Sequence, residues 1–336
     1  MFLLTVLGAI ISTVHAQTPG VNFICVPPGT CITNNTGGGS GVIDPRIVTP
    51  GGSVTTFPPV TSCPPGTVAC YGIVDGNACG RRYVTNVPIA DGQSVNGAYP
   101  WQVFIRNQTG YTGSGVLLDA NHVLTAAHKV NLNQGTPGNL EVYVGVYNPT
   151  DLTSAQRRTV TAMRIHPSFS ATTLRNDIAV LRLNTPISLG YQINVGTACL
   201  PSASASYVGR RCTVSGWGQT AFNVADAPTS PQRQVTVPIV SYATCRASMA
   251  QSNVLGSNVD IYLDTNELCA GGEANRDACT QDGGAPLVCE DNGRFNIAGL
   301  VIWGKNCGQP NIYGVYVDVA KYRSWVDSAV NELTFG

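Results

Sequence analysis

Charge is scarce in this sequence. Charged side chains make up only 11% of the 336 residues, and the formal net charge at pH 7 is zero. A nucleic-acid partner would require a basic stripe or patch. The composition therefore argues against binding of nucleic acid. The length suits one large domain together with a small one.

Metal-ligand patterns are also missing. There are only four histidines, none at ligand spacing from a cysteine pair, and no Cys-x-x-Cys occurs. A zinc site is therefore the weaker reading of the twelve cysteines, and we expect neither a metal nor another cofactor. In an oxidising compartment the same cysteines predict a disulfide framework.

Long apolar runs are absent beyond the amino terminus. The run from Phe2 to Ile11 is too short to span a bilayer, and Val14-His15-Ala16 offers small residues at cleavage spacing. Residues 1–16 therefore predict a signal peptide, and we expect a secreted, extracellular protein that is not held in a membrane. The sequons at Asn34 and Asn107 predict glycosylation.

The composition divides the remaining chain. Residues 17–73 are rich in Pro, Gly, Thr and Asn and hold four cysteines. We therefore expect a small disulfide-bonded domain there, followed by a linker over 74–90. Over residues 91–336, short Val- and Ile-containing runs alternate with turns, which predicts an all-β domain. Val319, Tyr322, Val326 and Val330 recur at helical spacing and predict a C-terminal helix.

Three motifs follow one another in the order histidine, aspartate and cysteine-flanked turn. They are Leu124-Thr125-Ala126-Ala127-His128, Arg175-Asn176-Asp177-Ile178-Ala179-Val180-Leu181 and the run from Cys279 to Cys289, which contains Gln281-Asp282-Gly283-Gly284. Together they resemble the motifs of the trypsin-like serine proteases, in that family's chain order. The resemblance covers about Asp91 to Val330. It implies a trypsin-like double six-stranded β-barrel with a C-terminal helix.

The same resemblance implies that catalysis has been lost. His128 and Asp177 match the general base and its orienting carboxylate, but Gly283 stands at the nucleophile and carries no side chain. Gln281 replaces the glycine whose N–H contributes to the oxyanion hole. In the family a new amino terminus pairs with the residue matching Asp282, but the basic cleavage residue expected before Val87-Pro88-Ile89-Ala90-Asp91-Gly92 is missing. We therefore expect a pseudoprotease, not an enzyme.

A substrate-like pocket is also implied. Asp277 stands six residues before Gly283, where trypsins place the aspartate that binds Arg or Lys, and Trp303, Gly304 and Gly314 match the pocket walls. The alternative is that Asp277 is a solvated loop residue. Ile302 replaces the polar serine that is usual in the family.

The resemblance also implies disulfide pairs. In the barrel domain these are Cys79–Cys199, Cys212–Cys289, Cys245–Cys269 and Cys279–Cys307. The bridge that normally flanks the catalytic histidine is missing, and its two positions fall at about Gly113 and Lys129. Residues 17–73 resemble a degenerate clip domain, which implies Cys25–Cys63 and Cys31–Cys70. A disulfide-pinned linker of another kind is the alternative.

Resemblance to clip-domain serine protease homologues without catalysis implies that the protein acts as a cofactor or scaffold in an arthropod immune cascade such as prophenoloxidase activation and melanization. The expected partners are extracellular proteases or zymogens, with prophenoloxidase as one candidate. Two alternatives stay open: an adhesion or developmental regulator that sequesters a protease or matrix ligand, and a residual trypsin-like endopeptidase. Arg81-Arg82 is the one dibasic pair between the two regions, and we expect an exposed linker there with processing after Arg82.

Overall fold

The computed structural model describes residues 24–26, 68–70, 79–84, 91–190, 192–219 and 228–336. In the amino-terminal region, β1 (Ile24–Val26) and β2 (Val68–Cys70) form an antiparallel pair. Cys25 and Cys70 belong to these two strands, whereas Cys63 and Cys31, their predicted partners, lie outside the described residues, as does the sequon at Asn34. None of the helices in the described ranges has the length and apolar character needed to cross a membrane.

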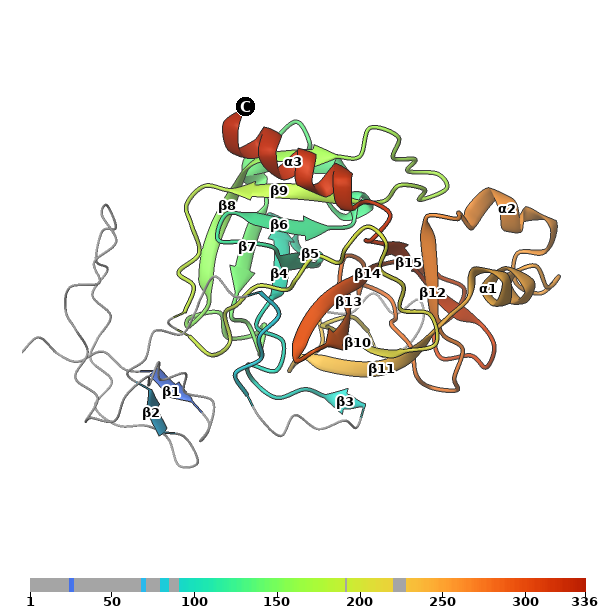
Figure 1. Cartoon of the computed structure of the whole chain (residues 1–336). Coiled ribbons are helices and arrows are strands. Elements are labelled where there is room, and N and C mark those ends of the chain that lie inside the picture. Colours follow the sequence, from blue (N-terminus) through green and yellow to red (C-terminus); the bar gives the residue numbers. More distant parts are fainter. Residues whose placement is uncertain (1–23, 27–67, 71–78, 85–90, 191, 220–227) are drawn as a thin grey trace, which may run out of the picture.

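Two β-barrels make up the large domain (Figure 1). The first barrel closes in the order β4-β5-β6-β9-β8-β7. Its strands are β4 (Gln102–Asn107), β5 (Gly110–Leu117), β6 (His122–Thr125), β7 (Glu141–Val144), β8 (Gln156–Ile165) and β9 (Ala179–Leu183). All neighbouring strands are antiparallel. Closure leaves the barrel without a free edge strand.

The second barrel follows the order β10-β13-β14-β15-β12-β11 and closes through the pairing of β10 with β11. Its strands are β10 (Arg211–Gly216), β11 (Arg233–Val240), β12 (Glu267–Gly271), β13 (Pro286–Asp291), β14 (Arg294–Gly304) and β15 (Tyr313–Asp318). The short β3 (Gly92–Gln93) pairs with β11. The all-β fold predicted from the sequence, with a double six-stranded barrel, is confirmed.

Alternating side chains fill each barrel. Val103, Ile105 and Leu117 are among the fully buried residues of the first barrel, and Val214, Val237 and Leu287 belong to the core of the second. Alternation shows in which cluster each side chain joins, because Phe104 between Val103 and Ile105 is also buried but packs in a separate aromatic cluster. The barrels therefore form a rigid frame for the loops between them.

The remaining elements are short helices and one longer helix. The short ones are η1 (Ala127–Lys129), η2 (Asn131–Asn133), η3 (Pro137–Asn139), η4 (Gly256–Asn258), α1 (Tyr242–Met249) and α2 (Val259–Tyr262). The C-terminal α3 (Arg323–Phe335) lies over β8 and β9 (Figure 1). The predicted helix begins later than the apolar spacing suggested. Val319 and Tyr322 are buried ahead of it, while Val326, Ala329 and Leu333 form its buried face.

Candidate functional site

His128 and Asp177 come together at one end of the first barrel. His128 lies in η1, directly after β6, and Asp177 comes two residues before β9. The Nδ1 atom of His128 is 2.5 Å from Oδ2 of Asp177, and the His128 backbone N–H donates to Oδ1 over 2.7 Å. Asp177 is fully buried. A buried carboxylate that accepts both bonds fixes the imidazole, which leaves Nε2 for the other side of the site.

Gly283 lies opposite that nitrogen, in the turn that leads into β13. A Cβ atom built on Gly283 would be 2.8 Å from Nε2 of His128. The turn is tied to the first barrel, because the Ser114 N–H of β5 donates to the Gly283 carbonyl over 3.1 Å. The next residue, Gly284, has φ +82°, and a Cβ there would overlap the Ser114 carbonyl. The three triad-equivalent positions therefore converge, and the one facing the imidazole has no side chain.

Lys129 occupies the space above Gly283. A Cβ atom on Gly283 would overlap the Cε atom of Lys129, and one on Gly113 would be 3.0 Å from both Cγ and Cδ. Gly113 and Lys129 are the positions at which the resemblance places the missing disulfide. Where a bridge would cross, a single lysine side chain now runs from Gly113 to Gly283. Burial lowers the pKa of its amine, and the charges of Asp282 and Asp177 oppose that shift.

Gln281 keeps a left-handed backbone at the position matching the oxyanion-hole glycine, with φ +72°. Its carbonyl accepts a hydrogen bond from the Tyr111 hydroxyl over 3.3 Å, and its Oε1 accepts one from Nε2 of Gln219 over 3.3 Å. Left-handed geometry is costly for a residue with a side chain, so these contacts stabilise the turn. The sequence did not reveal Tyr111, whose position four residues before Gly115 carried no motif.

A cavity of about 150 Å³ opens beside these residues. We call it the cleft, and its lining comprises His128, Lys129, Ala278, Cys279, Thr280, Gln281, Gly283, Val301, Ile302, Trp303, Gly304, Asn306, Cys307, Gly314, Val315 and Tyr316. The predicted wall residues Trp303, Gly304 and Gly314 all belong to it. The lining combines aromatic and aliphatic residues with the polar residues His128, Thr280, Gln281 and Asn306, and Lys129 is the one charged side chain among these described lining residues.

Asp277 lies behind the cleft rather than in its lining. Its Oδ2 accepts the Gly308 N–H over 3.2 Å, and its buried Oδ1 has no hydrogen-bond partner. A Cβ on Gly314 would be 3.0 Å from that oxygen. Burial raises the pKa of Asp277 to about 7. The alternative of a solvated loop aspartate does not hold, and in this conformation the carboxylate does not open into the cleft.

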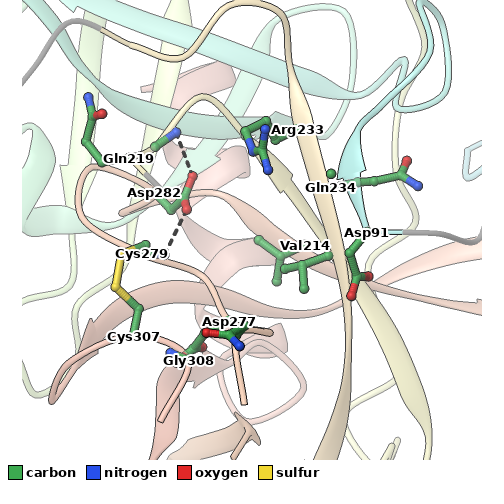
Figure 2. A pocket seen from close by; sticks show the side chains of 15 residues that line it. Asp91, Val214, Gln219, Arg233, Gln234, Asp277, Cys279, Asp282, Cys307 and Gly308 are labelled. Atoms are coloured by element: carbon green, nitrogen blue, oxygen red, sulfur yellow. Dashed lines mark hydrogen bonds between the residues drawn. A yellow bond between two sulfur atoms is a disulfide. The ribbon is translucent and has the colours of Figure 1, made fainter. Parts of the chain in front are cut away.

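A second cavity, of about 190 Å³, shares Cys279 and Cys307 with the cleft, and Figure 2 shows the side chains that line it. Asp91, Arg233, Asp277 and Asp282 are its charged lining residues. The Asp282 carboxylate accepts the N–H groups of Gly218 and Cys279, each over 2.9 Å, as the dashed lines in Figure 2 show. Burial raises the pKa of Asp282 to about 6, while those bonds and the charges of Lys129 and Arg233 oppose the rise.

Disulfides hold the turn and the barrels. The structure contains Cys79–Cys199, Cys212–Cys289, Cys245–Cys269 and Cys279–Cys307. These are the four barrel pairs that the resemblance implies. Cys279–Cys307 closes the wall between the two cavities, because both cysteines line each of them. Within the described part of the chain, no group of three His, Cys, Asp or Glu residues is arranged to hold a metal ion.

The residues around Arg82 correct one expectation. Its Nε donates to the Ala98 carbonyl over 2.7 Å, and its guanidinium lies 4.3 Å from the ring centre of Phe295 and 5.0 Å from that of Tyr99. Tyr83 is buried at 7% exposure. The exposed linker expected here is wrong for these two residues, because cation–π contacts and a hydrogen bond anchor them. Asn107 of the sequon ends β4 at a hairpin whose next two residues, Gln108 and Thr109, are exposed.

Comparison with known proteins gives the family. The profile described as Trypsin matches residues 89–326, which include both barrels and the triad-equivalent positions. This chain belongs to the trypsin family. The match begins close to Asp91, where the resemblance was expected to begin, and the predicted membership is confirmed.

Individual relatives match a longer part of this chain than the trypsin-family domain alone. The chain is 40% identical to "Inactive CLIP domain-containing serine protease A3" of Aedes aegypti, over 92% of this chain and 67% of that protein. It is 34% identical to "Phenoloxidase-activating factor 2" of Galleria mellonella, over 81% of this chain and 93% of that protein. With "Protein masquerade" of Drosophila melanogaster, the identity is 36% over 78% of this chain but only 24% of that protein. The predicted likeness to clip-domain serine protease homologues is thereby confirmed.

Proposed function

We propose that this protein is a secreted, non-catalytic serine protease homologue that acts as a cofactor or scaffold in an extracellular proteolytic cascade. The observation that carries the proposal is the overlap between Lys129 and the nucleophile position at Gly283. In triads of this kind, loss of the nucleophile costs on the order of 10⁶ in turnover. The retained His128–Asp177 pair has no hydroxyl at Gly283 to activate.

The relatives support the kind of cascade. One is named inactive, and another is named for phenoloxidase activation and is matched over 93% of its length. We therefore propose a role in innate immunity, in prophenoloxidase activation and melanization. The proposed partners are cascade proteases or zymogens, including prophenoloxidase.

Secretion is supported by the leader-like residues 1–16 and by the bridges of the barrel domain. Four disulfides are typical of proteins that fold in an oxidising compartment. The amino-terminal residues 17–73 are proposed to act as the clip-like domain, and the barrels as the surface that holds a protease or zymogen.

The first test is enzymatic. The purified secreted chain is incubated with peptides that have Arg, Lys or an aromatic residue before the scissile bond, and cleavage is followed by mass spectrometry. We expect no turnover above a mock preparation made from cells without the gene. Turnover above that background would contradict the non-catalytic part of the proposal.

The second test concerns the cascade. The chain is added to the source fluid together with prophenoloxidase, and phenoloxidase activity and the captured partners are recorded. We expect higher activity and capture of a cascade protease or zymogen. Capture of a matrix ligand without any change in phenoloxidase activity would favour the adhesion or developmental alternative instead.

A further inference from the structure

The charged lining of the cleft is of one sign. Its described lining contains Lys129 but no Asp or Glu. Asp177 is fully buried and engaged by His128, while Asp282 lines the second cavity and accepts two backbone N–H groups there. Neither carboxylate belongs to the cleft lining, so Lys129 is the charged side chain that a ligand in the cleft meets.

The turn at Gln281 and Gly283, which lines the cleft with Lys129, carries backbone donors. Among the described residues, the N–H groups of Gln281 and Gly283 have no protein acceptor, while the carbonyls of the same two residues are held by Tyr111 and Ser114. Both residues belong to the cleft lining. Fixed N–H groups of this kind stabilise negative charge on an oxygen.

The amine itself is placed by the Lys129 side chain. Its Cγ and Cδ atoms rest against Gly113, and its Cε atom lies where a side chain on Gly283 would begin. The amine nitrogen is one bond beyond Cε, and Lys129 belongs to the cleft lining. A peptide that continues past this point would place a neutral carbonyl against the amine and its next residue against the lysine stem.

A peptide whose last residue lies at the amine places a carboxylate there and has no further residue to contact the lysine stem. We propose that the cleft binds the free carboxyl end of a peptide whose last side chain is apolar, with the carboxylate paired to Lys129 and to the N–H groups of Gln281 and Gly283. The last side chain lies among Ile302, Trp303 and Tyr316. The inference rests on the proposed function in one respect, because such a ligand is held and not turned over.

The apolar choice follows from the walls. Val301, Ile302, Trp303 and Val315 line the cleft, whereas Asp277 lines the second cavity and its Oδ1 atom is sealed from solvent. Asp277 is not among the lining residues, so the last side chain of a bound peptide packs on these apolar walls. The carboxyl ends recognised here are those that a protease cutting after an aromatic or aliphatic residue releases.

Calorimetry with short peptides tests the proposal on the full secreted chain. Acetylated tripeptides ending in Phe or Arg are compared as free acids and as amides. We expect the Phe acid to bind about 10- to 100-fold more tightly than the Phe amide, as one charge-assisted hydrogen-bonded pair provides. Equal binding of acid and amide would overturn the proposal. Tighter binding of the Arg acid than of the Phe acid would overturn the apolar assignment.

Two variants test whether Lys129 is the side chain that binds the carboxylate. Lys129→Met keeps an unbranched stem as far as the ε position but removes the amine. It should weaken binding of the Phe acid about 10- to 100-fold while leaving binding of the amide unchanged. Lys305→Met is the matched control, because Lys305 is exposed and lies outside the cleft lining. We expect it to bind like the unmodified chain. Unchanged acid binding in Lys129→Met would overturn the role given to the lysine.

A second route keeps the test independent of that variant. Gly283→Ala adds a single carbon that overlaps Cε of Lys129 and displaces the amine, so preference for the acid should fall as well. Far-UV circular dichroism checks that each variant is folded. Mass spectrometry of the peptides after calorimetry separates the two failures: cleavage of the amide contradicts the proposed function, whereas intact peptides without acid preference contradict only this inference.

Discussion

Lys129 lies over Gly283, so that the space for a nucleophile is filled by a neighbour as well as vacated by the substitution. The Cβ position on Gly283 overlaps Cε of Lys129, yet it is only 2.8 Å from Nε2 of His128. The base and its carboxylate partner thus keep a catalytic arrangement around a position that a serine cannot enter without moving the lysine.

Restoring the serine should therefore fail. We expect Gly283→Ser to show no peptidase activity and to lose roughly 1–3 kcal/mol of unfolding free energy, as overpacked cores do. Denaturant unfolding and peptide hydrolysis measure both. Gly135→Ser is the control, because a Cβ there has nothing within 4 Å. Trypsin-like turnover by Gly283→Ser alone would contradict the steric explanation.

Shortening the lysine should reverse part of this effect. In Gly283→Ser/Lys129→Ala the overlap is removed, and the new hydroxyl can approach the imidazole that Asp177 orients. We expect covalent labelling by a fluorophosphonate in the double variant and not in Gly283→Ser, measured by intact mass. Equal labelling of the two variants would show that Lys129 does not block the site.

The sequence predicted the barrels because their strands, motifs and cysteine pairs carry strong local signals. It also placed His128, Asp177 and Gly283 correctly relative to one another, since their order in the chain is tied to the fold. It did not predict that Lys129 fills the site, because that depends on the empty space left at Gly113. Nor could it show that Arg82 is packed, because its ring partners Tyr99 and Phe295 are distant in the chain.

Stability should fall as the pH rises from about 5 to 8. Glu267 in β12 is 5% exposed, and burial raises its pKa to about 8, although Oε2 accepts the Asp264 N–H. The folded state therefore keeps a proton that the unfolded chain releases near its ordinary pKa, so this stabilisation is lost as the pH rises through the folded value. Asp277 and Asp282 shift in the same direction.

Replacing Glu267 isolates its part of that slope. Glu267→Gln cannot ionise, so we expect its unfolding free energy to fall less between pH 5 and 8 than that of the unmodified chain, by roughly 2–3 kcal/mol. Urea unfolding at several pH values measures this difference. Glu290→Gln, at an exposed position, is the control and should leave the slope unchanged. A parallel pair of curves for Glu267→Gln and the unmodified chain would contradict the assignment.

The Cys212–Cys289 bridge should contribute strongly to the second barrel. It joins β10 to β13, and both cysteines are buried, at 2% and 0% exposure. The double change Cys212→Ala/Cys289→Ala removes the bridge without stranding a thiol, and we expect a loss of about 2–4 kcal/mol in thermal or denaturant unfolding. Alkylation of the unreduced, unfolded wild-type chain should label neither cysteine, and labelling of either would refute the pairing.

Cleavage after Arg82 should be slow while the large domain is folded. A protease must draw the chain on both sides of the bond into its site in extended form, whereas Arg82 packs on Tyr99 and Phe295 and Tyr83 is buried.

Arg82→Ala removes the cation–π contacts and the hydrogen bond to Ala98 together with the basic residue itself, so digestion of this variant should instead move to Arg81. We expect trypsin to cut this variant after Arg81 faster than it cuts the unmodified chain after either arginine, measured by amino-terminal sequencing over time. Arg81→Ala, which leaves the packing of Arg82 in place, is the control and should resist. If the bond is cut, Cys79–Cys199 still joins the fragments, so electrophoresis should separate them only with reductant. Rapid cleavage of the folded, unmodified chain after Arg82 would contradict the anchoring described here.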